Sequence, residues 1–151
     1  MYEIVDGVWM GDYVAAASLD VIRDYNIGGI IQIGDALCFP YYKTVSGPHY
    51  LRISCPDHYT SSMFKHFDNM NEFINDTLDR GECVLIHCLS GLTRAPTAVM
   101  AYIVSVYPDV PLSDIYSWIK KRNSSVKIGS KFKKQLRAYR LRKTRGEENY
   151  I

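Results

Sequence analysis

One apolar run constrains the fold of this chain more than any other feature. It extends from Cys83 to Ile86 without polar interruption, which is typical of a strand buried on both faces of a parallel sheet. A short turn containing Gly91 follows, and a helical pattern begins near Ala95. Residues between such a strand and helix lie at the carboxyl end of a central strand, where open α/β sheets bind ligands.

The rest of the chain alternates between strand-like and helix-like segments. We predict strands at residues 3–10, 29–33, 50–53 and 83–87, and helices at about 14–26, 62–80, 95–107, 112–122 and 130–143. This alternation predicts an α/β layer sandwich, with helices flanking a central, mostly parallel sheet. With 151 residues and 47% apolar composition, the chain is expected to form one domain over residues 1–151.

The segment between the apolar strand and the helix has the composition of an anion-binding loop. It contains His87, Cys88, Leu89, Ser90, Gly91, Leu92, Thr93 and Arg94. Gly91 permits a positive φ, so the backbone amides from Leu89 to Arg94 can turn inward, and the helix start adds a partial positive charge. These features predict a cup for a tetrahedral oxyanion with the Cys88 thiol at its floor.

Two side chains in this segment suit chemistry on a phosphate ester. Amides and a helix N-terminus that face a sulfur favour the thiolate, which is the nucleophilic form of Cys88. The planar guanidinium of Arg94, six positions later, matches two phosphate oxygens. The departing oxygen also needs a proton, and Asp57, in a turn-rich loop before the helix predicted at 62–80, is the best candidate for that general acid.

The His-Cys-x5-Arg pattern after an apolar strand resembles the signature of the cysteine-dependent protein phosphatases, and the rest of the chain resembles their small, atypical dual-specificity branch. The resemblance covers nearly the whole chain. It includes the segments 7–12, 28–33 and 98–102, and the spacing that puts Asp57 ten residues before Phe67. It implies the cysteine-dependent phosphatase fold.

The resemblance also implies a role for each site residue. Cys88 forms a cysteinyl-phosphate intermediate, Arg94 binds phosphate, and Asp57 protonates the leaving group and then activates water. His87 hydrogen-bonds the loop and favours the thiolate. The implied phosphate-binding residues are His87, Leu89, Ser90, Gly91, Leu92, Thr93 and Arg94. The implied activity is hydrolysis of phosphotyrosine, and of phosphoserine or phosphothreonine, in proteins, with no cofactor and no metal ion.

Two positions depart from the family pattern. Ala95 stands where the family usually has Ser or Thr, whose hydroxyl stabilises the departing thiolate, so hydrolysis of the intermediate is expected to be slow. Gly129 lies where the family commonly has a Pro-Asn pair whose amide braces the phosphate loop, and Ser130 or Thr93 could replace that brace. Two alternatives stay open: a phosphatase for phosphoinositide, glucan or RNA 5′-phosphate, and a phospho-binding module with sluggish turnover.

Several of these residues also have a purely structural interpretation. Asp57 could cap the helix expected to begin near Ser61 or Ser62, and those serines compete for the same cap. Cys88 alone could be an ordinary buried cysteine, although the surrounding pattern argues against that. Cys55 is a candidate redox partner for Cys88. The aromatic residues Phe39, Tyr41 and Tyr42 could wall the site or fill the core.

Charge and cysteine usage bear on partners and location. The segment Lys120–Arg145 holds twelve Lys or Arg and no acidic residue, although the net charge is only +2. This basic segment could contact a polyanion, or it could be a solvated helix face. Neither paired cysteine spacing, nor a leader, nor a membrane-spanning segment is recognisable, so the sequence predicts a cytoplasmic protein, with a nuclear location open. The sequence does not predict the oligomeric state.

Overall fold

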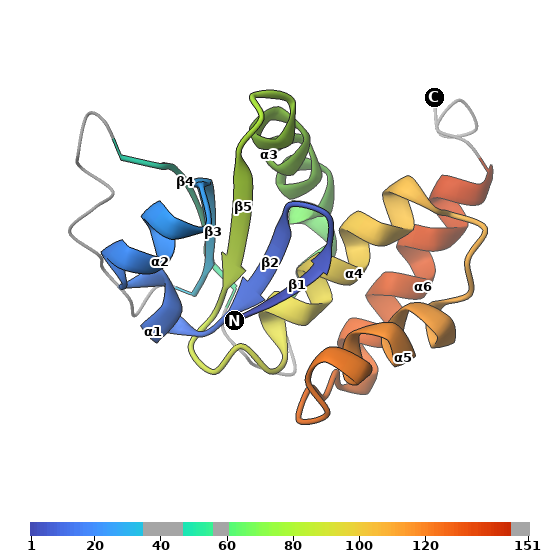
Figure 1. Ribbon diagram of the computed structural model, residues 1–151. Coiled ribbons are helices and arrows are strands. Elements are labelled where there is room, and N and C mark those ends of the chain that lie inside the picture. The colour runs from blue at the N-terminus through green and yellow to red at the C-terminus, as the bar shows by residue number, and fades with distance from the viewer. Residues whose placement is uncertain (35–46, 56–60, 146–151) are drawn as a thin grey trace.

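The computed structural model describes residues 1–34, 47–55 and 61–145, and its centre is a five-stranded sheet (Figure 1). The strands are β1 (Tyr2–Val5), β2 (Val8–Gly11), β3 (Ile27–Ile33), β4 (His49–Ile53) and β5 (Cys83–His87), in the order β1-β2-β5-β3-β4. β1 pairs antiparallel with β2, whereas the β2–β5, β5–β3 and β3–β4 pairs are parallel. The predicted mostly parallel sheet is confirmed, and the apolar run forms its central strand.

Helices cover both faces of this sheet (Figure 1). α1 (Tyr13–Ala16) and α2 (Leu19–Asp24) pack on one face, where Ile22 joins a small core with Ile30 and Leu85. The other face carries α3 (Phe67–Asp79), α4 (Arg94–Val106), α5 (Leu112–Arg122) and α6 (Ser130–Arg145) over the main core. Every residue of α4 from Ala95 to Val104 is buried, so this helix fixes the start at Arg94 rigidly against the sheet.

The N-terminal elements correct two sequence predictions. The strand predicted at 3–10 is the hairpin of β1 and β2, because Gly7 adopts a φ of +80° and turns the chain. The helix predicted at 14–26 is split into α1 and α2. Asp12 accepts a hydrogen bond from the Ala15 amide (3.0 Å), and Ser18 accepts one from the Val21 amide (3.3 Å), so each short helix has its own cap.

α3 begins later in the chain than predicted, and the cause is a contact with a residue far away in the sequence. A short 3-10 turn, η2 (Phe64–His66), precedes α3, so the regular helix begins at Phe67 and not near residue 62. The amides of Met63 and Phe64 donate to Oε1 of Gln135 on α6, at 2.7 and 3.0 Å. A side chain of α6 therefore takes the place of the local serine caps that the sequence offered.

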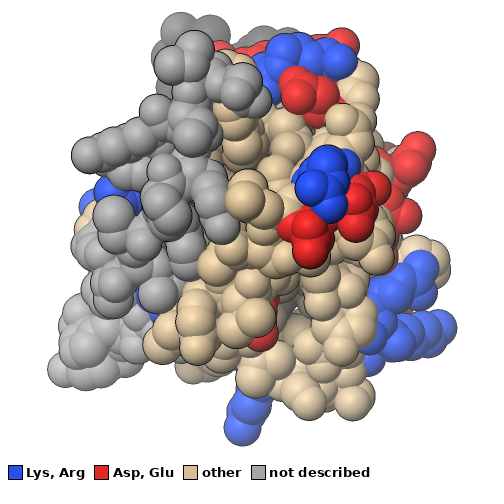
Figure 2. Space-filling model, turned by 60° about the vertical axis from the view of Figure 1, so that its left-hand side comes forward, with Lys and Arg blue, Asp and Glu red and all other residues tan. Residues whose placement is uncertain are grey.

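Among the described residues on the face shown in Figure 2, most are uncharged. Where charges occur on α2 they are paired, since Arg23 contacts Asp20 at 2.7 Å and Asp24 at 3.3 Å. None of the helices within the described ranges is long and apolar enough to cross a membrane.

Candidate active site

Residues 88–94, here called the 88–94 loop, connect the central strand β5 to α4. Cys88 is the first residue after β5 and is only 1% exposed. Its Sγ accepts hydrogen bonds from the backbone amides of Gly91 (3.3 Å) and Ala95 (3.4 Å). Two backbone N–H groups from opposite ends of the turn therefore point at the same sulfur.

Gly91 is required by the close packing of this loop against the end of β2. Its φ is +75°, and a Cβ at this position would lie 2.8 Å from the carbonyl carbon of Gly11 and 3.0 Å from the nitrogen of Asp12. The Tyr13 amide also donates to the Leu89 carbonyl, at 3.4 Å. The start of α1 thus fixes the outer side of the loop, and only glycine fits at position 91.

Arg94 reaches across the ends of two neighbouring strands. Its Nη1 donates to the carbonyl of Cys55, two residues beyond β4, at 3.1 Å. Gly34, directly after β3, has a φ of +121°, and a Cβ there would lie 2.8 Å from the same nitrogen. The guanidinium is therefore held at the carboxyl ends of β3 and β4, and β3 is the neighbour of β5, the strand that Cys88 follows.

His87 is the last residue of β5 and has no exposed surface. Burial lowers the pKa of His87 to about 4, although a hydrogen bond to the Cys88 backbone and the charge of Asp12 both act in the opposite direction. The imidazole is therefore neutral at neutral pH. This protonation state suits a hydrogen-bonding support beneath the loop better than a proton donor to a substrate.

A brace on the 88–94 loop comes from the segment between α5 and α6. Thr93 Oγ1 donates to the Lys127 carbonyl (3.0 Å), and the Lys127 amide donates to the Leu92 carbonyl (2.9 Å). Of the two candidates for the missing family brace, Thr93 is the one that contacts this segment, whereas Ser130 is the first residue of α6. The role of Lys127 had no sequence signal, since it uses only backbone atoms.

Of the remaining predicted residues, some lie in the described part of the loop and others lie outside the described residues. Ser90 Oγ accepts a hydrogen bond from the Leu92 amide (3.2 Å), and Leu89 is 51% exposed at the edge of the loop. Asp57 lies outside the described residues, as do the aromatic residues Phe39, Tyr41 and Tyr42. Within the described ranges, no group of three or more His, Cys, Asp or Glu side chains is arranged as metal ligands would be.

The chain matches a protein-family model and resembles several named proteins. Residues 8–142 match the family model described as "Dual specificity phosphatase, catalytic domain". Human "Dual specificity protein phosphatase 9" is 27% identical over 151 residues, which is 97% of this chain and 38% of that protein. "Dual specificity protein phosphatase 22" of Xenopus laevis is 29% identical over 136 residues, covering 90% of this chain and 63% of that protein. The chain thus spans less than two thirds of either relative.

Solved structures resemble the whole described fold. The human "tyrosine phosphatase-like serine/threonine/tyrosine-interacting protein" superposes with a TM-score of 0.86 at 25% identity, over 93% of this chain and 95% of that one. The structure of "DUSP15" superposes with a TM-score of 0.84 at 26% identity, over 93% of this chain and 86% of that one. The fold is therefore shared with these two proteins over about nine-tenths of this chain.

Proposed function

This chain belongs to the dual specificity phosphatase family, and on that premise we propose that residues 1–151 form one catalytic domain that hydrolyses phosphotyrosine, and phosphoserine or phosphothreonine, in proteins. The observation that carries the proposal is the convergence of the Gly91 and Ala95 amides on Cys88 Sγ. This geometry supports a nucleophilic sulfur at the base of an anion-binding loop.

The proposed reaction has two steps. In the first, the Cys88 thiolate attacks phosphorus, an S–P bond forms, the ester P–O bond breaks, and Asp57 gives its proton to the departing oxygen. In the second, Asp57 takes a proton from water, the water oxygen bonds to phosphorus, and the S–P bond breaks to release inorganic phosphate and thiolate. Arg94 and the loop amides hold the phosphoryl oxygens throughout. The role of Asp57 as acid and base is inferred from its position in the sequence.

The edge of the site favours substrates with apolar residues beside the phosphorylated one. Leu89, Tyr13 and Val14 are all exposed, and the hydrogen bond from the Tyr13 amide to the Leu89 carbonyl brings them to one edge of the loop. Exposed apolar side chains grouped at the edge of a site are typical of surfaces that contact a partner. We expect them to pack against the substrate chain.

The basic segment Lys120–Arg145 supports an additional contact with acidic groups of a phosphorylated substrate. Two of its cations already attract a carboxylate, because Arg142 forms an ion pair with Asp68 and Lys143 lies 3.6 Å from the same side chain. A surface with this density of positive charge attracts anions over about one Debye length, roughly 8 Å at physiological ionic strength. Turnover of acidic phosphopeptides is then expected to fall more steeply with added salt than turnover of neutral ones.

A second candidate function is favoured by one residue. Ala95 is completely buried beside the sulfur and has no hydroxyl with which to stabilise the thiolate as it leaves phosphorus. A protein that binds the phosphorylated residue in the same loop but turns it over only sluggishly would act as a phospho-binding module. The human structural neighbour is named as a phosphatase-like interacting protein, which is compatible with this alternative.

Turnover of a panel of phosphorylated substrates, peptide and non-peptide, tests the proposal. Phosphotyrosyl, phosphothreonyl, phosphoinositide and RNA 5′-phosphate substrates are compared for wild type, Cys88→Ser and Cys83→Ser. We expect phosphotyrosyl turnover in wild type, none in Cys88→Ser, and normal turnover in Cys83→Ser, a matched change five residues earlier on β5. Cys88→Ser should still bind phosphate, because the backbone amides remain.

Two outcomes with the same substrates would contradict the proposed function. Activity in Cys88→Ser would remove the sulfur from the mechanism, and selective turnover of a non-protein phosphate would replace the proposed substrate class. In pre-steady-state measurements, a burst followed by slow turnover indicates slow hydrolysis of the intermediate. Tight phosphopeptide binding with no burst favours the binding module.

A further inference from the structure

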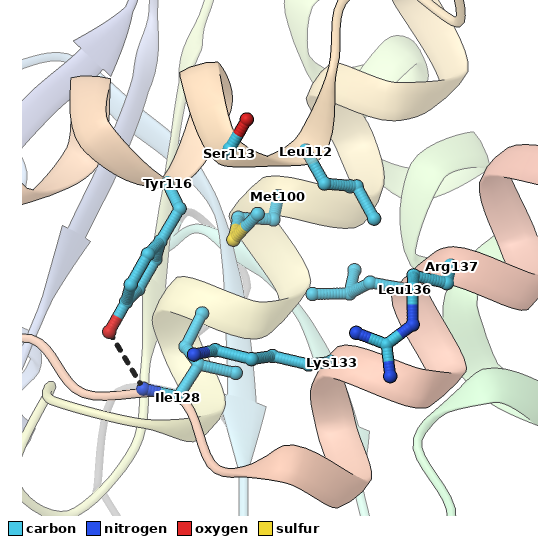
Figure 3. A pocket seen from close by; sticks show the side chains of 8 residues that line it. All are labelled: Met100, Leu112, Ser113, Tyr116, Ile128, Lys133, Leu136 and Arg137. Atoms are coloured by element: carbon cyan, nitrogen blue, oxygen red, sulfur yellow. Dashed lines mark hydrogen bonds between the residues drawn. The ribbon is translucent and has the colours of Figure 1, made fainter.

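A pocket of about 350 Å³ opens between α4, α5 and α6, and no residue of the 88–94 loop lines it (Figure 3). Its volume lies within the range of small-molecule sites, about 300–1,000 Å³. The pocket is therefore separate from the proposed catalytic centre and large enough for a ligand of its own.

The floor of the pocket is part of the main hydrophobic core. Met100 of α4, Leu136 of α6 and Ile128 are at most 3% exposed, and all three belong to that core. Leu112 and Tyr116 of α5 form the opposite wall, and Figure 3 shows Met100 between this wall and the side chains from α6. A ligand in this pocket would contact a mostly apolar surface, so the ligand needs an apolar body.

Two cations border this apolar floor. Lys133 and Arg137 are one turn apart on α6, so both point to the same side of the helix, and both extend along the pocket in Figure 3. Lys133 Nζ lies 5.0 Å from the centroid of the Tyr116 ring. The Arg137 side chain makes no hydrogen bond or ion pair with any residue that the structure describes. None of the described lining residues is acidic.

We propose that this pocket binds a small amphipathic anion, specifically an alkyl or aryl carboxylate with an apolar body. The apolar part would lie on Met100, Ile128 and Leu136, and the carboxylate would pair with Lys133 and Arg137. At about 30 Å³ for each non-hydrogen atom, the volume that one water occupies in the liquid, the pocket holds roughly twelve such atoms. Decanoate has this size and chemistry.

Methyl NMR of the full chain, with methionine methyl groups labelled with carbon-13, tests the proposal. Decanoate is titrated in the presence of excess inorganic phosphate, which occupies the 88–94 loop, and the Met100 resonance is assigned by its loss in Met100→Leu. We expect a saturable shift of this resonance. Decyltrimethylammonium, which has the same chain and the opposite charge, should bind at least about fivefold more weakly, as expected for the loss of two partly exposed ion pairs.

Charge variants on one helix supply the matched control. K133Q/R137Q should weaken decanoate binding about fivefold, whereas K131Q/K134Q removes the same charge from α6 outside the pocket and should change binding less than about twofold. Ser113→Trp, at an exposed position of the lining, should block binding without disturbing the core.

Three results would overturn the proposal: an unmoved Met100 resonance, equal binding by both charge variants, or equal affinity for the cationic detergent. None of these measurements uses turnover. The proposed pocket and the proposed phosphatase activity can therefore fail independently of one another.

Discussion

Burial of His87 is expected to make the protein less stable in mild acid. Its folded-state pKa is about 4, whereas the same imidazole in the unfolded chain has a pKa of about 6.5. Between these two values the unfolded chain binds a proton that the folded protein does not, so the free energy of unfolding falls as pH decreases through this window. Above pH 6.5 the stabilising effect of a neutral His87 is fully present.

The size of the effect follows from the same two values. The separation of about 2.5 pH units corresponds to a maximum loss of about 3 kcal/mol, reached near pH 4. Between pH 7 and pH 5 the expected loss from His87 alone is about 2 kcal/mol. This is a large part of the stability of a domain of this size, about 5–15 kcal/mol.

Urea unfolding at pH 7 and pH 5, for wild type and His87→Gln, measures this loss. The variant lacks the titrating group, so its stability should fall by about 2 kcal/mol less than that of wild type between the two pH values. His66 also has a pKa lowered by burial and by Lys65, and it contributes equally to both proteins. His49→Gln, at an exposed position of β4, is the matched control and should behave like wild type. Equal losses in wild type and His87→Gln would refute the argument.

Three further substitutions test the loop. Thr93→Val removes the hydrogen bond to the Lys127 carbonyl and should lower kcat/KM for phosphopeptides about fivefold to tenfold. Ser130→Ala, the control, should leave kcat/KM nearly unchanged. Equal effects of the two substitutions would exclude Thr93 as the brace of the loop. Gly91→Ala combines positive φ with a backbone clash and should lower the free energy of unfolding by at least about 2 kcal/mol in urea titrations, and an unchanged value would mean that the loop relaxes freely. Ala95→Ser should raise the steady-state rate after the burst without changing the burst amplitude. An unchanged rate would show that the missing hydroxyl at residue 95 does not slow hydrolysis of the intermediate.

Local signals in the sequence were sufficient for the architecture around the candidate site. The apolar run 83–86, the glycine and the following helix place Cys88 at the carboxyl end of the central strand, as observed. The boundaries near the N-terminus were missed although signals existed. Gly7 marks the hairpin turn, and Asp12 and Ser18 are good cap residues, but hydrophobic periodicity alone merged the elements that they separate.

Other features had no local signal. The start of α3 depends on Gln135, more than sixty residues away in the chain, and its cap exists only after α6 has packed. The brace from Lys127 and the contact of Arg94 with Cys55 both use backbone carbonyls, which every residue type carries. Such contacts follow from the packing of distant segments and could not be predicted from residue identity.

If the Cys88 sulfur is the atom that attacks phosphorus, it carries the phosphoryl group between the two steps, and this covalent product can be trapped. Wild type is mixed with a phosphotyrosyl peptide, quenched in acid within the burst phase and mapped by mass spectrometry of its peptides. We expect one phosphoryl group on the peptide that contains Cys88, and none in Cys88→Ser. Turnover with no phosphoryl group on that peptide, or with the group on another residue, would contradict this role of Cys88.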